Sequence, residues 1–529
     1  MKKIKKKHLF IITLFGLSYN LTAQIPGSLN ENFNQVGWND SIVANNNGVA
    51  ITKTMIQPDG KIIVVGETNF SNEGVESIIV RYNIDGSVDD TYGGGDGIFR
   101  SWNDLEIYMR GNGTAMQSDG KVIVGGDFFY ISERLIRVNT DGSLDTSFGE
   151  QGMIDIQRPN DEYLYHIAVQ SDNKIIVCGK ERLQVNGSFI DHVFLSRFSE
   201  NGVVDASFGI DGKVSYITDD FSFSSLQIND LLVLPNDKVI VNISFTKFSN
   251  YSVMLTRFNA NGTMDSAFGN AGHVIKSELT STDNFRYSTS AIQTNGSIVS
   301  IFTASDENNF ETPFSDELFR VNEQGVLDNS FSISIPNGKL FPDFSQVQVA
   351  ENRIFLFDKN NLPQNQGDPS FDKIFCFDLS GNPVSSFGNN GVAIIDGNDI
   401  PITYYSSAAV ISNSGTIFLS SYSEDIEIPE QRNLVLSSVN GFNQDLSILD
   451  QEAEDNLFFF PNPTTGIVSI LNSENKVIDK IEVVDVLGKV VYEKYQNTTQ
   501  IDISSVSKGI YIINLYTEGN KIQKRIIKN

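Results

Sequence analysis

The stretch RVNTDGSLDTSFGEQG, Arg137–Gly152, decides the fold, because copies of it recur along the chain. Close copies begin at Arg81, Arg197 and Arg257, and weaker ones begin at Arg320 and Cys376. The aromatic residues of the copies follow one another at intervals of 56 to 63 residues, at Tyr92, Phe148, Phe208, Phe268, Phe331 and Phe387. A period of about 60 residues predicts units stacked or arranged in a ring, since one such unit is too small to bury a core alone.

Each period also contains a second pattern, which is typical of a β-hairpin. In MIQPDGKIIVVGE, Met55–Glu67, a polar turn lies between two apolar arms that are rich in β-branched residues. Equivalent segments bring the number of copies to seven and begin at Met116, Val169, Val233, Ile292, Val349 and Ile411. Together with the motif around Arg137, each period therefore predicts four short antiparallel strands of about five residues.

Seven units of four strands over residues 25–446 predict a seven-bladed β-propeller, with an open β-solenoid as the alternative. The ends of this region favour the closed ring. GSLNENFN, Gly27–Asn34, reads as the second half of a unit, and NLVLSSVN, Asn433–Asn440, as part of the missing first half. We expect the N-terminal segment to complete the last blade and seal the ring, which leaves no exposed sheet edge.

The repeated pattern G-φ-φ-D-x-S-F-G-x-x-G, in which φ is apolar, resembles the delta-60 repeat family and, more distantly, the NHL-type propeller repeats. The resemblance covers about 420 residues. It implies the propeller fold but almost nothing about function, because propellers carry many unrelated activities.

Within the motif, the arginine and the aspartate are expected to face each other across a turn. Counting outward from the turn at Thr140–Gly142 places Arg137 opposite Asp145. Opposite charges in such a cross-strand pair contribute roughly 0.2–1 kcal/mol. The same pairing is expected for Arg81 and Asp89, Arg197 and Asp205, Arg257 and Asp265, and Arg320 and Asp328.

Two blades lack both members of the pair. Cys376 and Val384 occupy the two positions in the sixth blade, and Ser438 and Asn30 occupy them in the closing blade. The joint loss favours a paired structural role for the aspartates over a catalytic or metal-binding role.

The first 24 residues read as a secretory signal peptide. Five lysines precede the short apolar run LFIITLFGL, and small and polar residues follow, so cleavage is expected near Gln24. The apolar run is too short to span a bilayer, although a membrane anchor is the alternative. No later segment is predicted to cross a membrane.

The C-terminal part is predicted to be a separate domain. Residues 447–456 form an acidic linker, and short alternating strands over residues 457–529 predict a small immunoglobulin-like β-sandwich. These residues resemble the type A C-terminal sorting domain of the Bacteroidetes type IX secretion system. The matching residues are Pro461, Asn462, Pro463, Gly466, Asp485, Gly488, Lys489, Gly509, Tyr511, Lys524, Arg525 and Lys528.

The resemblance implies a partner and a destination. The type IX machinery would recognise residues 457–529, and the cargo would be secreted or attached to the outer-membrane surface. An accessory sandwich without a sorting role is the alternative.

The charge of the chain limits its partners. The formal net charge is −26, and removal of the five signal lysines makes it −31. Nucleic acid is therefore not expected as a partner, because phosphate is repelled by such a surface. Solubility explains the acidity, with Ca2+ binding as the alternative; no other cofactor is predicted. The two cysteines, Cys178 and Cys376, lie three repeats apart and are not expected to form a disulfide.

No catalytic constellation is recognisable. The histidines His8, His166, His192 and His273 lack metal-ligand spacing, and neither a G-x-S-x-G elbow nor a phosphate loop is present. The loops on the variable side are rich in carboxylates, namely Asp306, Glu307, Glu311, Asp316, Glu317, Glu424, Asp425, Glu427 and Glu430. Aromatic residues on the same side are Trp102, Tyr108, Tyr163, Tyr165, Phe221, Phe285, Tyr287, Tyr404 and Tyr405.

These observations favour a non-enzymatic binding or adhesion module, for which a glycan or a protein is the expected ligand on the variable-loop side. The first alternative is a carboxylate-based polysaccharide hydrolase or lyase, which needs two carboxylates at a fixed separation. The second alternative is a purely structural surface protein.

Overall fold

A computed structural model of the chain shows two compact units, Met1–Phe442 and Asn443–Asn529, and each is described by itself. The residues described are 26, 28–41, 49–70, 74–101, 109–128, 132–157, 163–185, 187–216, 225–247, 250–280, 285–305, 315–333, 335, 346–359, 371–396, 403–424, 432–441, 457–460, 464, 466–472, 478–485, 489–495, 500–517 and 520–528. The predicted signal peptide and acidic linker lie outside these residues. In the described part of the chain, no helix has the length and apolar character that a membrane span requires.

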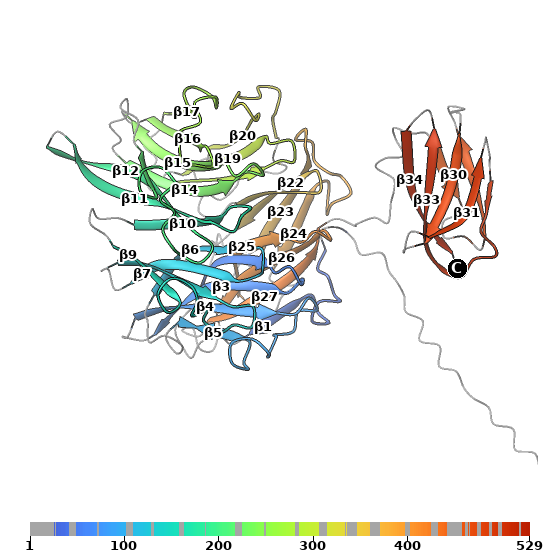
Figure 1. Cartoon of the computed structure of the whole chain (residues 1–529), viewed down its shortest axis with the longest axis horizontal. Coiled ribbons are helices and arrows are strands. Elements are labelled where there is room, and N and C mark those ends of the chain that lie inside the picture. Colours follow the sequence, from blue (N-terminus) through green and yellow to red (C-terminus); the bar gives the residue numbers. More distant parts are fainter. Residues whose placement is uncertain are drawn as a thin grey trace, which may run out of the picture. The chain divides into compact units, whose positions relative to one another are not determined.

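The first unit consists of seven antiparallel sheets, which are the blades of a β-propeller (Figure 1). Blade 1 contains β2 (Val49–Ile56), β3 (Ile62–Phe70), β4 (Gly74–Tyr82) and β5 (Ile98–Arg100), and blade 2 contains β6 (Met109–Met116), β7 (Val122–Phe128), β8 (Ser132–Val138) and β9 (Met153–Gln157). Blade 3 contains β10 (Tyr163–Val169), β11 (Ile175–Val185), β12 (Ser188–Phe198) and β13 (Lys213–Tyr216). Blade 4 contains β14 (Ser225–Val233), β15 (Val239–Lys247), β16 (Asn250–Phe258) and β17 (His273–Thr280). Blade 5 contains β18 (Phe285–Ile292), β19 (Ile298–Ser305) and β20 (Ser315–Val321). Blade 6 contains β21 (Gln346–Ala350), β22 (Arg353–Lys359), β23 (Phe371–Asp378) and β24 (Val392–Asp396). Blade 7 contains β25 (Thr403–Ile411), β26 (Thr416–Glu424), β27 (Arg432–Asn440) and β1 (Trp38–Ser41).

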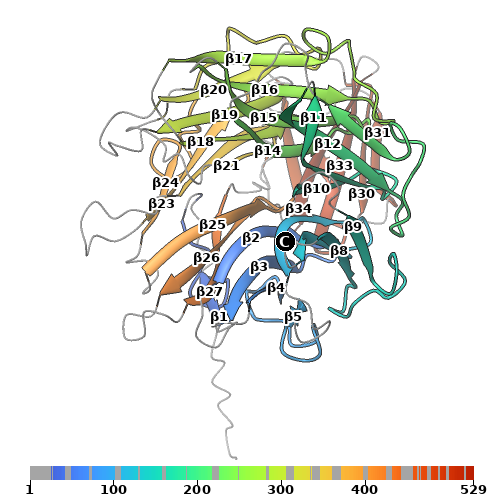
Figure 2. The ribbon, with the colours of Figure 1, turned by 90° about the vertical axis from the view of Figure 1, so that its left-hand side faces the viewer.

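The first strands of the blades surround a central channel. Strands β2, β6, β10, β14, β18, β21 and β25 each contact the first strands of the neighbouring blades, and Figure 2 shows several of them facing the middle of the ring. In blades 1 to 6 the remaining strands follow outward in chain order, whereas in blade 7 β26 and β27 are followed by the N-terminal strand β1. The predicted seven-bladed propeller is therefore the observed fold of the first unit.

The N-terminal segment closes the ring, but not with the residues that were predicted to form the closing strand. The edge strand is β1, where Trp38 pairs with Ser437 of β27. Within the predicted segment Gly27–Asn34, Gly27 lies outside the described residues, and Leu29 forms an isolated bridge to Val439. The segment therefore forms the turn that precedes the outer strand, as the equivalent motif does in the other blades.

The pattern also predicts that the residues after the motif's turn, such as Val204 and Phe208, form the fourth strand of the blade, and this prediction is wrong. In blade 3, Phe198 and Val204 form a single bridge, and the fourth strand, β13, begins only at Lys213. Pairing stops because the side chain of Asp205 accepts hydrogen bonds from the backbone N–H (3.1 Å) and hydroxyl (2.6 Å) of Ser207, which turns the chain. The inner strands are also longer than the predicted five residues, and β11 and β12 reach 11 residues each.

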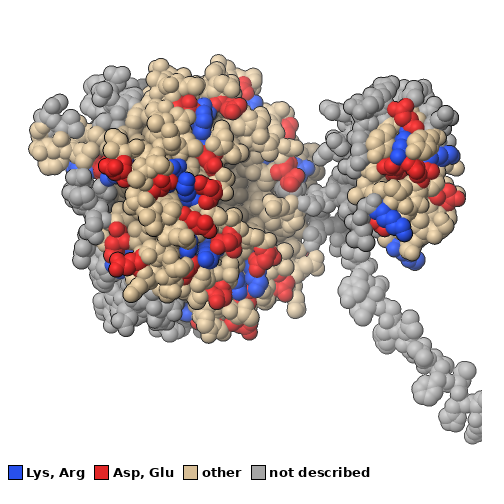
Figure 3. Space-filling model, in the orientation of Figure 1, with Lys and Arg blue, Asp and Glu red and all other residues tan. Residues whose placement is uncertain are grey.

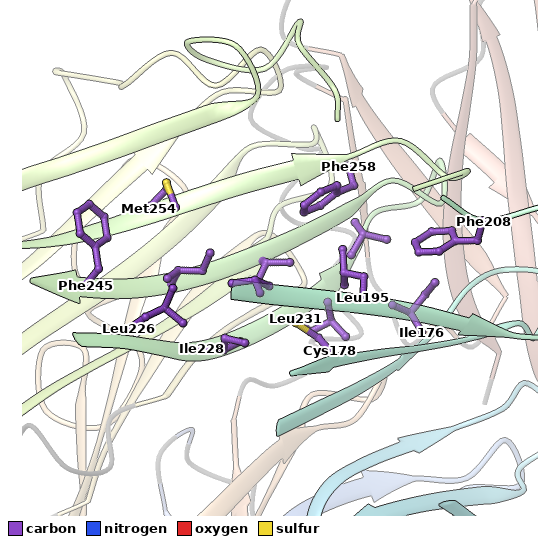
Figure 4. Close-up of a cluster of buried hydrophobic side chains, with 14 residues drawn as sticks. Ile176, Cys178, Leu195, Phe208, Leu226, Ile228, Leu231, Phe245, Met254 and Phe258 are labelled. Atoms are coloured by element: carbon purple, nitrogen blue, oxygen red, sulfur yellow. The ribbon is translucent and has the colours of Figure 1, made fainter. Parts of the chain in front are cut away.

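Apolar side chains from adjacent blades pack into shared cores, as alternation along each strand predicts. Figure 4 shows one such core between blades 3 and 4, in which Cys178 of β11 packs with Ile228 of β14. The motif aromatics belong to these cores, and Phe148 and Phe208 are fully buried between neighbouring blades. Cys178 and Cys376 are both buried and unpaired, so packing rather than a disulfide joins the blades.

The second unit contains two sheets. One sheet holds β28 (Leu457–Phe460), β29 (Ile467–Asn472) and β32 (Gln500–Asp502), and the other holds β31 (Val490–Tyr495), β30 (Lys480–Asp485), β33 (Gly509–Thr517) and β34 (Asn520–Lys528). Val468 and Ile501 of the first sheet share a core with Ile481, Ile513 and Ile526 of the second. The two sheets therefore pack face to face as a small β-sandwich.

Candidate ligand site in the axial channel

The structure brings together the arginine and aspartate of all five repeated pairs. The pairs lie 2.7 Å apart for Arg81–Asp89, 2.8 Å for Arg137–Asp145, 2.9 Å for Arg197–Asp205, 2.7 Å for Arg257–Asp265 and 2.6 Å for Arg320–Asp328. The register is the predicted one, because Val138 bridges to Leu144 and the backbone N–H of Asp145 donates to the carbonyl of Arg137 at 2.8 Å.

Each arginine also reaches the next blade, which the sequence reasoning did not predict. Arg137 donates from Nη1 to the carbonyl of Glu200 in the following blade at 2.6 Å and to Oε1 of Gln117 at 3.0 Å. Its guanidinium also lies over the ring of Phe148, with Cζ 4.7 Å from the ring centroid. The corresponding acceptors in the next blade are the carbonyls of Thr140 for Arg81, Ala260 for Arg197, Glu323 for Arg257 and Leu379 for Arg320.

The backbone repeats this link between blades. The N–H of Gly149, next to the motif aromatic, donates to the carbonyl of Asn201 in the next blade at 2.9 Å. Equivalent bonds join Asn34 to Asp85, Gly93 to Asp141, Gly209 to Asn261, Gly269 to Gln324 and Gly388 to Pro26. The motif is therefore a clamp between consecutive blades, and it continues through the point of ring closure.

The aspartates of the clamp are held in the ionised state. Burial opposes the charge of Asp145, but hydrogen bonds from Ser147 and Lys121 and the nearby Arg137 lower the pKa of this carboxyl well below its usual range. Lys121 contributes an ion pair of 2.9 Å to the same carboxylate. A carboxylate so fully engaged has little capacity to act as a general acid or a metal ligand.

The two exceptional blades replace the ion pair with neutral contacts. In the closing blade, the Asn30 side chain donates to the Ser438 hydroxyl at 3.4 Å. In blade 6, Val384 packs against the buried cluster that contains Cys376.

Equivalent positions of the repeat carry different chemistry where they line the channel. A cavity of 710 Å³ is lined by the first strands of all seven blades. The residue four positions before the first turn of each blade lines this cavity, and these residues are Lys53, Gly113, His166, Asp230, Thr289, Gln346 and Ala408. In five of the seven first strands, β2, β6, β10, β14 and β25, a register shift lies directly beside this position. Such bulges often redirect a side chain next to a site.

Three ionisable side chains from different blades converge there. Asp230 accepts hydrogen bonds from the N–H groups of Leu231 (2.9 Å) and Ser290 (3.1 Å) and from the hydroxyl of Thr289 (3.4 Å). Lys53 donates to the carbonyl of Thr114 at 3.2 Å. These bonds hold the carboxylate of Asp230 in blade 4 and the amine of Lys53 in blade 1 at the channel cavity.

The protein environment lowers the pKa of two of these groups. Desolvation lowers the pKa of Lys53, although the residue as a whole is exposed, and the charge of Asp230 opposes this shift. Desolvation also lowers the pKa of His166, whose Nε2 lies 3.4 Å from the carbonyl oxygen of Ile228, so the imidazole is neutral at pH 7. The channel thus offers a fixed carboxylate, an amine and a neutral imidazole to a polar ligand.

The sequence reasoning noted His166 but missed Lys53 and Asp230. Aligning the seven hairpins on their first turns would have shown that this one position carries a different residue in each blade. The carboxylates Asp306, Glu307, Glu311, Asp425, Glu427 and Glu430 and the aromatics Trp102, Tyr108 and Phe221 lie outside the described residues. Tyr163 and Tyr165 instead line a separate cavity of 290 Å³ on blade 3, with Lys180, Arg182 and Asp191.

Acidic and basic side chains intermingle over the propeller on the face in Figure 3. Among the described residues, no group of three or more His, Cys, Asp or Glu side chains could hold a metal ion.

The residues that resemble a sorting motif are spread over the second unit. Gly466 precedes β29, Asp485 ends β30, and the N–H of Lys489 donates to Asp485 Oδ1 at 2.9 Å. Tyr511 is buried, and its hydroxyl donates to the carbonyl of Ser507 at 2.8 Å. Gly509 begins β33, and Lys524, Arg525 and Lys528 lie on β34. Pro461, Asn462, Pro463 and Gly488 lie outside the described residues.

Two families match parts of the chain. Residues 458–529 match the secretion system C-terminal sorting domain. Residues 57–92, 117–148 and 170–208 match a domain of unknown function, the DUF5122 β-propeller. A comparison with curated protein sequences finds no match.

Several solved structures are similar at low identity. PorZ, a surface component of the type-IX secretion system of Porphyromonas gingivalis, is 12% identical with a TM-score of 0.37, over 89% of this chain and 58% of PorZ. The β-propeller domain of the Trilobed protease from Pyrococcus furiosus is 10% identical with a TM-score of 0.37, over 77% of this chain and 99% of that one. The GH93 α-L-arabinofuranosidase of Fusarium graminearum is 10% identical with a TM-score of 0.35, over 76% of this chain and 97% of that one.

The residues that match the DUF5122 β-propeller lie in the first unit, which consists of seven sheets. The residues that match the sorting domain form the β-sandwich of the second unit. The chain is thus a β-propeller that matches the DUF5122 model over residues 57–92, 117–148 and 170–208, followed by a unit that matches the secretion system C-terminal sorting domain. This C-terminal match indicates secretion or attachment to the cell surface.

Proposed function

We propose that the chain is exported by the type IX system after removal of residues 1–24, and that its propeller is a non-enzymatic module that binds a glycan or a protein. One observation carries the binding role: Lys53, His166 and Asp230 converge from three blades in a cavity of 710 Å³. The repeated Arg–Asp charges are engaged in clamps between blades, whereas Lys53 and Asp230 line the channel cavity.

The composition of the channel supports binding rather than hydrolysis. Among the residues that line the described cavity, Asp230 is the single carboxylate, whereas glycoside hydrolysis uses two. Asp230 already accepts three hydrogen bonds, which hold its side chain in place as an anchor for a ligand. A polysaccharide hydrolase or lyase that uses loop carboxylates is the second candidate, motivated by the acidic variable loops.

The test uses the mature chain, residues 25–529, on a glycan array and on an array of surface proteins, with product analysis for each ligand bound. Asp230→Asn removes the charge and keeps the shape, so we expect it to weaken binding at least tenfold, because buried charge-assisted bonds contribute about 1.5–3 kcal/mol. Arg182→Ala, at an exposed ion pair on blade 3, is the control and should bind normally.

Two results would contradict the proposal. Undiminished binding by Asp230→Asn would remove the channel as the site. Conversion of a bound glycan into shorter products would replace the binding role with the enzymatic one.

A further inference from the structure

The channel cavity holds two side chains of opposite charge that do not pair with each other. Lys53 and Asp230 both line the cavity, and among the described residues neither forms an ion pair. The other side chains of the lining carry no charge, because His166, whose pKa is lowered by desolvation, is neutral at pH 7. The aspartates of the clamps, in contrast, are paired with arginine, as in Arg137–Asp145. Within the described part of the chain, the cavity therefore presents one cation and one anion without a counterion.

Both groups are accessible and have hydrogen-bonding capacity left. Asp230 is half-buried, and its carboxylate accepts one bond on Oδ1, at 2.9 Å, and two on Oδ2, at 3.1 Å and 3.4 Å. A carboxylate accepts about four, so Oδ1 can accept another. Lys53 is exposed and donates to the carbonyl of Thr114 at 3.2 Å, which leaves further N–H groups of the ammonium for a ligand.

The surroundings of Lys53 act on its charge in two directions. Desolvation lowers the pKa of the amine, and the negative charge of Asp230 raises it. Because the residue as a whole is exposed, its desolvation is incomplete, which favours the ammonium form. A ligand carboxylate beside the amine would raise this pKa further, so the carboxylate and the ammonium stabilise each other.

We propose that the channel binds a short peptide with both ends free, whose ammonium meets Asp230 and whose carboxylate meets Lys53. This inference rests on the proposed binding role of the channel and narrows its ligand to one class. Opposite charges attract most strongly where protein has displaced water, so a zwitterion gains from both groups at once. A ligand with a single charge satisfies one group only, and a neutral glycan satisfies neither.

The remaining lining suits the peptide groups between two such ends. Gln346 is half-buried; its Oε1 accepts from the N–H of Ala409 at 3.3 Å, and its Nε2 donates no hydrogen bond to the described residues. This amide can therefore donate to a peptide carbonyl. The cavity volume of 710 Å³ lies within the range of about 300–1,000 Å³ that is usual for small-molecule sites, which limits the ligand to a few residues.

The experiment measures binding of four forms of one peptide to the mature chain by calorimetry. The peptide is the strongest ligand selected from a library of free-ended peptides of two to four residues. Its N-acetylated form lacks the ammonium, its amidated form lacks the carboxylate, and the doubly blocked form lacks both. Either single block should weaken binding by wild type at least tenfold, because hydrogen bonds to charged groups are the strong ones.

Two variants assign each end of the peptide to one residue. Asp230→Asn should bind the free peptide at least tenfold more weakly and should respond to N-acetylation by less than about twofold, while amidation still weakens its binding at least tenfold. Lys53→Met, which keeps an unbranched side chain without charge, should show the reverse pattern. A purely structural role of either residue would weaken all four forms equally. Arg182→Ala, outside the lining, is the control and should bind every form as wild type does.

The outcomes separate this inference from the proposed function. It is overturned if no free-ended peptide binds saturably, if wild type binds all four forms equally, or if the variants do not show the crossed pattern. A glycan or folded protein that binds wild type and is weakened by Asp230→Asn would then leave the proposed function intact, whereas the absence of any ligand that depends on Asp230 would remove both. The four forms are compared on wild type without any substitution, so this comparison remains decisive even if a variant does not fold.

Discussion

Replacing Arg137 with alanine tests whether the repeated motif is a clamp between blades or a local pair within one hairpin. The guanidinium is 2% exposed and bonds Asp145 at 2.8 Å in its own blade. It also bonds the carbonyl of Glu200 at 2.6 Å and Asn201 Oδ1 at 3.3 Å in the next blade.

The two interpretations predict different magnitudes. A local cross-strand pair would contribute roughly 0.2–1 kcal/mol. Breaking a buried ion pair costs about 3–5 kcal/mol, because a desolvated charge loses its partner. Asp145 keeps Lys121 at 2.9 Å and the Ser147 hydroxyl at 2.6 Å, which places the expected loss for Arg137→Ala at the lower end, about 3 kcal/mol.

The assay is guanidinium-induced unfolding of the mature chain, with the free energy of unfolding taken from the midpoint and slope of the propeller transition. Arg182→Ala is the control, because its ion pair with Asp191 is half exposed and such pairs contribute about 0–1 kcal/mol. Arg137→Lys should fall between the two, since a lysine keeps the charge but lacks the fork that reaches both blades. If Arg137→Ala costs no more than Arg182→Ala, the clamp interpretation is refuted.

Three further predictions concern the interfaces and export. Gly142→Ala should destabilise the propeller more than Gly94→Ala does. Both glycines have φ near +87°, but a Cβ at Gly142 would lie 2.3 Å from the N of Gly93, whereas a Cβ at Gly94 would meet nothing within 4 Å. Equal losses in unfolding free energy would contradict this prediction. Burial lowers the pKa of His273 below 6.5, so its neutral form stabilises the fold above pH 6.5, and this contribution is lost as pH falls through the folded pKa. The variant His273→Gln should therefore lose less unfolding free energy than wild type between pH 7 and pH 5. If the unfolding free energy of both proteins falls equally with pH, this prediction is contradicted. Deletion of residues 457–529 should leave the propeller in the periplasm, as measured by fractionation and surface immunolabelling, and normal surface display of the truncated chain would refute the sorting role.

Much of the fold could be predicted because each repeat is defined by residues that lie close together in the sequence. Turn residues such as Asp141 and Gly142 and the flanking alternation identify the hairpins, and their recurrence gives the blade number. The predicted start of the fourth strand was wrong. The hydrogen bonds from Ser207 to Asp205 end the strand pairing, and the alternation of apolar and polar residues gives no sign of them.

The sequence by itself determined the period, the Arg137–Asp145 pairing and the identity of the C-terminal domain, because each depends on residues close together in the chain. Only the tertiary structure decided which groups meet across blades. Lys53 and Asp230 are 177 residues apart (230 minus 53), yet both line the channel cavity. Ring closure creates these contacts, since a circular arrangement places equivalent positions of distant repeats around one axis.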